Sequence, residues 1–297
     1  MSIEQGRTLR RRDVMRGGAL AAGMLAFGPG FWRDVLAAEP AQPGPGPYGG
    51  LLGPDANGLA LPPGFSSRLV ARAGEPVAGT AYAFPVLPDG QGTFPTPDGG
   101  WILVTNSETR DRGTGGASAI RFGADGRMAS ATRILGGTTW NCAGGRTPWG
   151  TWMSCEEVAD GQVWECDPTG TEPAVARPAM GRFKHEALAV DPVGQRLYLS
   201  EDEHGDAGFY RFTPAAYPDC SAGVLEIALV EADDSVRFLP VPDPVATDEP
   251  TRDQVRGSAR FDRGEGMWLD SGTVYLVTSN DNRIHAYDTR TGRIEVL

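Results

Sequence analysis

Short runs that alternate between apolar and polar residues recur along this chain from residue 101 onward. In each run an apolar segment ends in polar or acidic residues, and a turn with Gly or Asp leads into a second apolar segment. Alternation with a period of two is typical of strands with one buried face, so the pattern predicts four antiparallel strand pairs. The four copies join residues 101–108 to 118–122, 150–157 to 163–166, 197–202 to 209–212, and 274–281 to 284–287.

The copies also have a characteristic spacing. Their starts lie 49, 47 and 77 residues apart, and the last interval holds an acidic, Pro-rich insertion around residues 243–253. Repeats of about 40–50 residues with several short strands each are typical of β-propeller blades. The 41 glycines and 24 prolines disfavour long helices. The sequence therefore predicts an all-β fold, a β-propeller that is either closed within the chain or incomplete at its C-terminal end.

The polar residues of the four copies lie at the same end of the same strand. In a radial arrangement of blades these ends meet at one face around the central channel. Carboxylates gathered there repel one another and are costly to desolvate unless cations lie between them. The pattern therefore predicts a hard-metal site. Asp and Asn that merely end strands and cap turns would explain any single copy, whereas the coincidence across copies favours the metal.

The first 38 residues have the order of a twin-arginine export signal. Paired arginines and a further basic residue lie in residues 10–16, an uncharged apolar stretch follows at 17–27, and small residues suited to cleavage lie at 36–38. An Arg-rich surface helix is the alternative, but it would not be followed by so long an uncharged stretch. We expect a signal peptide at 1–38, a Pro/Gly-rich linker or strap at 39–64 and the propeller at 65–297.

The apolar stretch in this segment is too short and too rich in Gly to span a bilayer. The protein is therefore not expected to be an integral membrane protein. Instead, the twin-arginine export machinery is its expected partner, and the expected location is periplasmic or secreted. Without residues 1–38 the chain has 21 basic and 35 acidic residues, a formal charge of −14, which disfavours binding to nucleic acid.

The densest candidate segment is residues 141–157. Its paired glycines allow a backbone bend close to a ligand, and Cys142 just before them could offer a thiolate to a transition metal such as iron. A disulfide is the alternative, because four cysteines allow three connectivities in an oxidising compartment. The adjacent Glu156 and Glu157 point to opposite faces of a strand, so at most one of them faces a shared site.

A second candidate segment is residues 181–186. Lys184 is the single lysine of the chain, against 26 arginines, which suggests a specific need for a compact ammonium, as in phosphate contact. His185 and Glu186 fit the roles of general acid and metal ligand. A blade-linking loop with solvated charges is the alternative.

The third candidate segment is residues 262–268. Arg263 and Glu265 lie two apart, so on an extended chain they point the same way and could hold an anion and a cation side by side. Their mutual ion pair is the alternative. Elsewhere, residues 201–204 form either a calcium-type ligand group, with Asp202 facing inward, or an acidic hairpin tip. His285 lies in a strand and is expected to be structural.

The chain lacks G-x-S-x-G, G-x-x-x-x-G-K-[ST] and H-E-x-x-H, so the usual serine-hydrolase, P-loop and zincin interpretations lose their main support. The three candidate segments together resemble the PhoX family of bacterial alkaline phosphatases. This resemblance implies an exported β-propeller that holds iron and calcium and hydrolyses phosphate esters. It matches Cys142, Glu186 and Glu265 to metal-ligand positions and Arg263 to a phosphate-contacting arginine. Glu108 and Glu157 are further metal-ligand candidates.

Three hypotheses follow from these residues. The first is a metal-dependent phosphomonoesterase in which the ions act as Lewis acids and Arg263 and Lys184 neutralise the charge on the phosphoryl group. The second is a calcium-binding propeller without catalysis, acting as a scaffold or binding module. The third is a propeller lactonase that uses one calcium ion, which would not explain Cys142.

Overall fold

The structure is a computed structural model and describes residues 48–297. The predicted signal peptide and residues 39–47 of the predicted linker lie outside this range. The described residues fall into two units, 48–69 and 70–297. In the described part of the first unit, the Asp55 carboxylate accepts hydrogen bonds from the Ser67 hydroxyl and from the backbone N–H of Asn57.

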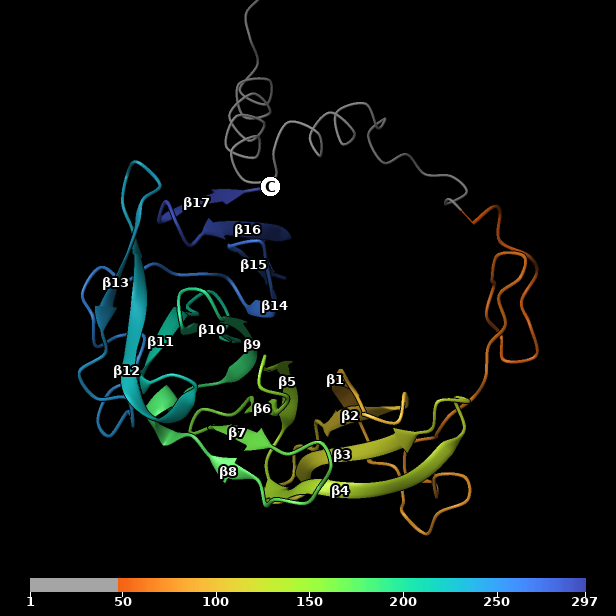
Figure 1. Cartoon of the computed structure of the whole chain (residues 1–297). Helices are drawn as coiled ribbons and strands as arrows, with labels where there is room; N and C mark the ends of the chain where they lie inside the picture. Colours follow the sequence, from red (N-terminus) through yellow and green to blue (C-terminus); the bar gives the residue numbers. More distant parts are fainter. Residues whose placement is uncertain (1–47) are drawn as a thin grey trace, which may run out of the picture. The chain divides into compact units, whose positions relative to one another are not determined.

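The second unit consists of four antiparallel sheets, coloured in chain order in Figure 1. The first is β1 (Pro88–Pro95), β2 (Trp101–Ser107), β3 (Gly115–Phe122) and β4 (Met128–Thr138). The second is β5 (Asn141–Arg146), β6 (Trp152–Glu156), β7 (Val163–Cys166) and β8 (Val175–Ala176). The third is β9 (His185–Asp191), β10 (Arg196–Glu201), β11 (Phe209–Ala216), β12 (Asp219–Val230) and β13 (Val236–Pro240). The fourth is β14 (Gly264–Asp270), β15 (Thr273–Thr278), β16 (Arg283–Asp288) and β17 (Arg293–Val296).

The only helix in the described residues is the 3-10 turn Pro178–Met180, and none of these residues forms a helix suited to crossing a membrane. The prediction of an all-β propeller is therefore confirmed. The four predicted strand pairs are β2–β3, β6–β7, β10–β11 and β15–β16, the second and third strands of their sheets. The four predicted strand pairs do not include the first strand of each sheet, and these first strands prove to position the site.

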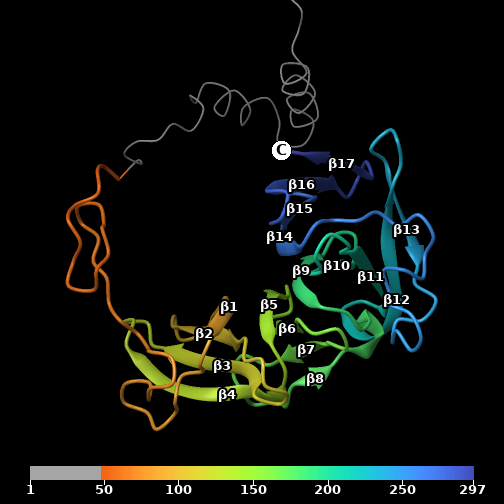
Figure 2. The ribbon, with the colours of Figure 1, turned by 180° about the vertical axis from the view of Figure 1, so that it is seen from behind.

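The first strands β1, β5, β9 and β14 lie innermost and side by side, as both views show (Figures 1 and 2). Apolar side chains fill the spaces between neighbouring sheets, because each strand turns alternate residues to each of its faces. Val104 and Trp152 belong to the cluster between the first two sheets. Met153 and Leu199 belong to the cluster between the second and third sheets, and Tyr198 and Val274 to that between the third and fourth. Burial of each such large side chain stabilises the fold by about 1.5–3 kcal/mol.

The long connection between β13 and β14 covers residues 241–263 and contains the predicted acidic insertion. Val241 and Val255 are buried in the core between the second and third sheets, and Phe261 is buried in the next core. The Thr251 hydroxyl lies 2.9 Å from the Tyr210 hydroxyl beneath it. The insertion is thus anchored to the third sheet at several points.

Candidate metal centre

The same two positions in every sheet carry the candidate ligands. One is the second residue of the innermost strand, and the other is the residue that directly follows the second strand. We call these eight residues the central donor cluster. They are Asp89 and Glu108 in the first sheet, Cys142 and Glu157 in the second, Glu186 and Asp202 in the third, and Glu265 and Ser279 in the fourth.

A β-bulge re-aims the side chains at this place in each sheet. The register between the first and second strands shifts by one residue just beyond the donor position in all four sheets. In the third sheet, for example, His185 pairs with Glu201 but Leu188 pairs with Leu199. An extra residue of this kind bends the strand and turns its side chain toward a site.

A repeated hydrogen bond fixes the second donor position. In each sheet the cluster residue that follows the second strand donates a hydrogen bond from its backbone N–H. The acceptor is the carbonyl oxygen of the residue two places before the cluster residue on the innermost strand. The four pairs, N–H first, are Glu108 and Leu87 (2.9 Å), Glu157 and Trp140 (2.9 Å), Asp202 and Lys184 (3.1 Å), and Ser279 and Arg263 (3.1 Å). Lys184 and Arg263 therefore hold equivalent positions in neighbouring sheets.

Three of the four residues that accept this hydrogen bond have left-handed backbone conformations. The φ angles of Leu87, Trp140 and Arg263 are 47°, 51° and 60°. A residue with a side chain in this region costs about 1–2 kcal/mol, so the surrounding contacts must hold it in place. This strain recurs where the chain enters the innermost strand of the first, second and fourth sheets.

The Cys142 thiol is the meeting point of the donors from the first three sheets. It donates a hydrogen bond to the Asp89 carboxylate at 2.7 Å. Ligand atoms of Asp89, Glu108 and Cys142 lie within 4.8 Å of one another, as do those of Cys142, Glu157 and Glu186. Two overlapping groups of potential metal ligands thus share one sulfur atom.

Asp202, Arg263 and Glu265 adjoin these groups. Asp202 accepts hydrogen bonds from Arg263 Nε at 2.9 Å and Nη2 at 2.8 Å, and its carboxyl also interacts with that of Glu157. Glu265 lies 3.6 Å from Arg263 Nη2 and accepts a hydrogen bond from the Ser279 hydroxyl at 2.7 Å. The structure therefore brings together all six residues predicted as metal ligands, with Arg263 beside them. Lys184 lies at the edge of the cluster, where its ammonium pairs with Glu203 at 3.0 Å.

Crowding of carboxyls changes their protonation. Burial, followed by repulsion from Asp202 and Glu108, raises the pKa of Glu157 to about 8. Burial and the neighbouring carboxylates raise the pKa of Glu186 to about 8 as well. Burial and Glu186 also raise the pKa of the Cys142 thiol above its ordinary value. Shifts of this sign are expected of buried, crowded carboxyls, and cations bound between them would lower these pKa values.

The side chain of Asn106 holds Cys142 in place. Its Nδ2 donates to the carbonyl oxygens of Cys142 (3.0 Å) and Ala143 (2.6 Å), and its Oδ1 accepts from the Trp152 Nε1 (2.9 Å) and the Ser154 hydroxyl (2.8 Å). All of the side-chain hydrogen-bonding capacity of this buried amide is used. Asn106 therefore joins the first two sheets directly beneath the cluster.

The structure decides between the two glutamates that the sequence left open. Glu156 points away from the cluster, where its carboxylate accepts hydrogen bonds from the backbone N–H of Thr139 (2.8 Å) and from Trp164 Nε1 (3.0 Å). Glu157 faces the cluster. Glu201 and Asp202 divide in the same way, and Asp202 faces inward as expected.

His185 does not lie in the cluster, so the general-acid interpretation was wrong. Its ring is fully buried against Phe183, with ring centroids 3.6 Å apart, and its Nε2 lies 3.1 Å from the Gly181 carbonyl oxygen. Burial lowers the pKa of His185 to about 3, so the ring is neutral at physiological pH. The reason is strand alternation, since Glu186 occupies the face turned toward the site.

Sequence analysis missed Asp89, which precedes the first of the four recognised copies. A signal was present in the Asp-Gly pair at residues 89–90. A side chain on Gly90 would bring its Cβ within 2.6 Å of the Ala143 Cα, so this strand and the next approach closely beside the donor.

The four cysteines are free thiols, so the structure does not contain the disulfide considered as an alternative. Cys155, Cys166 and Cys220 are buried, whereas Cys142 is partly accessible. Cys142 is thus the thiol available to a ligand.

The fold and the cluster together define a β-propeller with an acidic, thiol-containing centre. A family model described as alkaline phosphatase PhoX matches residues 113–295, more than half of the chain. The chain belongs to this family, and its class is that of alkaline phosphatase-type phosphomonoesterases. The matched range contains every predicted site residue except Glu108 and favours the first of the three hypotheses.

Solved structures agree with this fold. The chain is similar to Pseudomonas fluorescens PhoX in complex with vanadate, a transition state analogue, with 18% identity, 80% of this chain and 69% of that chain covered, and a TM-score of 0.61. A gluconolactonase from Xanthomonas campestris has 17% identity over 66% of this chain and 57% of its own, with a TM-score of 0.37, too low to support an argument. No curated protein matches by sequence.

Proposed function

We propose that this protein hydrolyses phosphate monoesters at the central donor cluster with iron and calcium bound there. The observation that carries the proposal is the pair of overlapping ligand groups that share Cys142.

The donor set suits two kinds of metal ion. A cysteine thiolate is a soft ligand that favours transition metals such as iron, and carboxylate oxygens favour hard cations such as calcium. We expect Cys142, Glu186 and Glu265, with Asp89, Glu108, Glu157 and Asp202 around them, to hold the ions. When bound, the ions would act as Lewis acids on the phosphoryl oxygens.

Arg263 is suited to orient the phosphoryl group. Its Nε and Nη2 bind both oxygens of Asp202, which fixes the plane of the guanidinium, while the side chain remains 40% exposed. Although burial opposes this effect, the hydrogen bonds and charge of Arg263 lower the pKa of Asp202, which keeps that carboxylate ionised for the pair. The outer edge of the guanidinium, with Nη1, is left to bind a phosphoryl oxygen.

Lys184 would contribute a second positive charge from the equivalent position in the neighbouring sheet. Its side chain is one-third exposed and lies near enough to Asp202 to influence that carboxylate. Together, Lys184 and Arg263 would stabilise the charge that develops on the transferring phosphoryl group.

Elemental analysis combined with a chromogenic phosphate-ester assay tests the proposal. We expect both iron and calcium in the purified protein, and turnover that Glu265→Gln abolishes without unfolding the chain. Glu295→Gln, an exposed change in the same sheet, serves as the matched control and should leave turnover unchanged. Calcium without iron and without turnover would instead indicate a binding module, and full activity in Glu265→Gln would remove that residue from the site.

We further propose export by the twin-arginine route to the periplasm or the medium. The order of residues 10–38 supports this proposal. Replacement of Arg11 and Arg12 by lysine should retain the protein in the cytoplasm, and cell fractionation with an activity assay measures the outcome. Unchanged export of this variant would exclude the route.

A further inference from the structure

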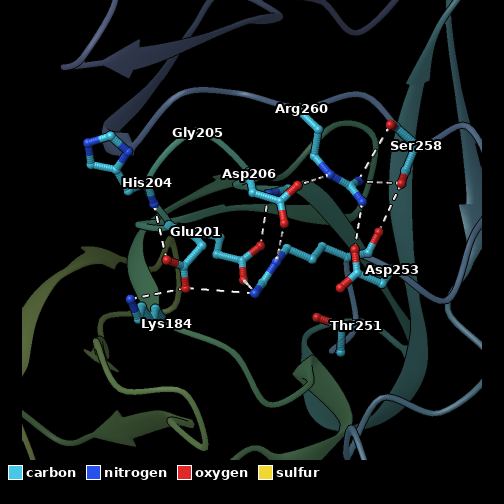
Figure 3. A network of polar contacts seen from close by, with 12 residues as sticks. Lys184, Glu201, His204, Gly205, Asp206, Thr251, Asp253, Ser258 and Arg260 are labelled. Carbon is cyan, nitrogen blue, oxygen red and sulfur yellow. Dashed lines mark hydrogen bonds and ion pairs between the residues drawn. The ribbon is translucent and has the colours of Figure 1, made fainter. Parts of the chain in front are cut away.

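A network of ion pairs lies beside the central donor cluster, and the function proposed above gives no role to its arginines. Arg252, from the insertion between β13 and β14, binds three carboxylates. Its Nη1 lies 2.7 Å from Glu201 Oε1, its Nε 3.1 Å from Asp206 Oδ2, and its Nη2 3.8 Å from Glu203 Oε2. Figure 3 shows the network extending from Lys184 at one end to Arg260 and Asp253 at the other.

Glu203 is shared between this network and the candidate site. The same oxygen, Oε2, that faces Arg252 lies 3.0 Å from the Lys184 ammonium. The backbone of Glu203 also accepts a hydrogen bond from the Arg263 N–H at 3.3 Å. Glu203 therefore contacts both residues expected to bind the phosphoryl group, Lys184 through its ammonium and Arg263 through its backbone.

A cavity of about 200 Å³ lies beside Lys184. Arg182, Lys184 and Glu203 line it together with Arg252 and residues 246–251 of the insertion. Arg252 is consequently part of the wall of a cavity that Lys184 also lines. Its guanidinium, however, is committed to carboxylates and is not aimed at a ligand.

We propose that Arg252 is a positioning residue for Lys184, an inference that rests on the proposed phosphatase function. Arg252 attracts Glu203 and so prevents that carboxylate from pairing with Lys184 alone. More of the positive potential of the Lys184 ammonium then remains available to a phosphate group. Arg252 also neutralises Glu201, whose carboxylate is fully buried and would otherwise add negative potential behind the site.

Replacement of Arg252 by Gln should weaken phosphate binding more than turnover. Glu203 would then pair with Lys184 only, and Glu201 would lose its cation. We expect KM for a chromogenic phosphate monoester and the inhibition constant of inorganic phosphate each to rise about tenfold, the size expected for one charge-assisted contact, while kcat changes less than about threefold. Arg252→Lys keeps the charge but cannot bridge three carboxylates, so its effect should be intermediate.

Arg260 provides a matched control from the same insertion. It binds Asp206 at 2.6 Å and Asp253 at 2.8 Å, and within the described residues none of its contacts reaches Glu203 or Lys184. Arg260→Gln removes the same charge and a comparable number of hydrogen bonds. It should change KM and the phosphate inhibition constant less than about twofold, because it does not act on Lys184.

A double-mutant cycle separates positioning from a general structural effect. In a Lys184→Met background the added Arg252→Gln change should raise KM no more than about twofold, because the residue that it positions is already absent. Equal effects of Arg252→Gln with and without Lys184, or equal effects of Arg252→Gln and Arg260→Gln, would overturn the proposal. Should Arg252→Gln not fold, Arg252→Lys in both backgrounds gives the same comparison.

Calorimetry of inorganic phosphate binding to the metal-loaded wild-type protein separates failure of the proposed phosphatase function from failure of the positioning role of Arg252. A wild-type protein that neither hydrolyses the ester nor binds phosphate overturns the proposed function and this inference with it. A wild-type protein that does both, together with an Arg252→Gln variant that binds phosphate with unchanged affinity, overturns the positioning role alone.

Discussion

Two acidic groups of side chains lie next to each other in this protein and differ in how their charge is balanced. The central donor cluster has six carboxyls and a thiol, with Arg263 as the cation in contact with them. The neighbouring network places Glu201, Glu203, Asp206 and Asp253 around Arg252 and Arg260. Adjacent residues of one strand end, Glu201 and Asp202, belong to different groups because strand side chains alternate.

The pKa values record this difference. In the cluster, burial and repulsion raise the pKa of Glu157 and of Glu186 to about 8. In the network, burial raises the pKa of Glu201 although Arg252 opposes this shift. Burial acts on Asp206 too, but the hydrogen bonds and charges of Arg260 and Arg252 lower its pKa. The acidic network is balanced by two arginines of its own, whereas the central donor cluster, with Arg263 as its cation in the described residues, would gain stability from added cations.

The largest expected effect is on metal content and activity. Glu186→Gln should remove bound metal and reduce kcat/KM at least about 100-fold. Mutation of even an outer partner of a metal ligand lowers metal affinity or activity by about 10–100-fold. Glu201→Gln, an equally buried change in the network, should leave the metal content unchanged. Elemental analysis and the ester assay measure both. Loss of metal in both variants would show that the two groups are not separate.

When a chelator has removed the metal, Glu201→Gln should lower the stability of the fold more than Glu186→Gln does. Glu201 accepts hydrogen bonds from the Gly208 N–H and the Tyr210 hydroxyl as well as from Arg252. In Glu201→Gln the new amide NH₂ must face one of these donors, so the free energy of unfolding should fall by about 2 kcal/mol.

Glu186→Gln removes a repelled carboxyl instead and should leave the stability of the chelated protein unchanged or increase it. Urea unfolding in chelator gives both values. A loss of stability in Glu186→Gln as large as that in Glu201→Gln would contradict the contrast between the two groups.

The chelated protein should also become less stable as the pH rises. The pKa values of Glu157 and Glu186 are about 8 in the folded chain, above the ordinary value of 4.5. At a pH between these two values, the folded chain therefore holds more protons than the unfolded chain. The contribution of these two carboxyls to stability is complete below the ordinary pKa. It is lost as the pH rises through the raised pKa of the folded chain. The melting temperature in chelator should therefore fall between about pH 4.5 and pH 8.

Glu157→Gln combined with Glu186→Gln is the control for this pH dependence. With both carboxyls removed, the fall in melting temperature over the same range should become smaller. An equally steep fall in the double variant would assign the pH dependence to other groups.

The smallest effect concerns thiol reactivity. Cys142 is the partly accessible thiol of the chain, and bound metal would cover it, so an alkylating reagent should label one thiol after chelation and none before. The raised pKa of Cys142 should make this labelling slow at neutral pH. Mass spectrometry with Cys142→Ser as the control identifies the modified residue. Labelling of Cys155 in the folded protein would contradict its burial.

The repeated strand pairs and most of the site residues could be predicted from the sequence. A strand pair such as β2–β3 is local in the chain, so the alternation of its residues is enough to reveal it. Rare features also carried information, since the single lysine, Lys184, and the Arg263–Glu265 pair both lie at or beside the cluster. For the same local reason, the insertion around residues 243–253 was visible as an interruption of the repeat.

Only the tertiary structure decided which residues share a site. The bulge beside each donor, the choice of Glu157 over Glu156, the burial of His185 and the presence of Asp89 all depend on how the innermost strands of separate sheets approach one another. The link from Arg252 to Lys184 through Glu203 joins residues 68 positions apart along the chain. Local periodicity determines which residues form strands, but register and packing between distant strands determine where each side chain points, and these depend on contacts that no short stretch of sequence contains.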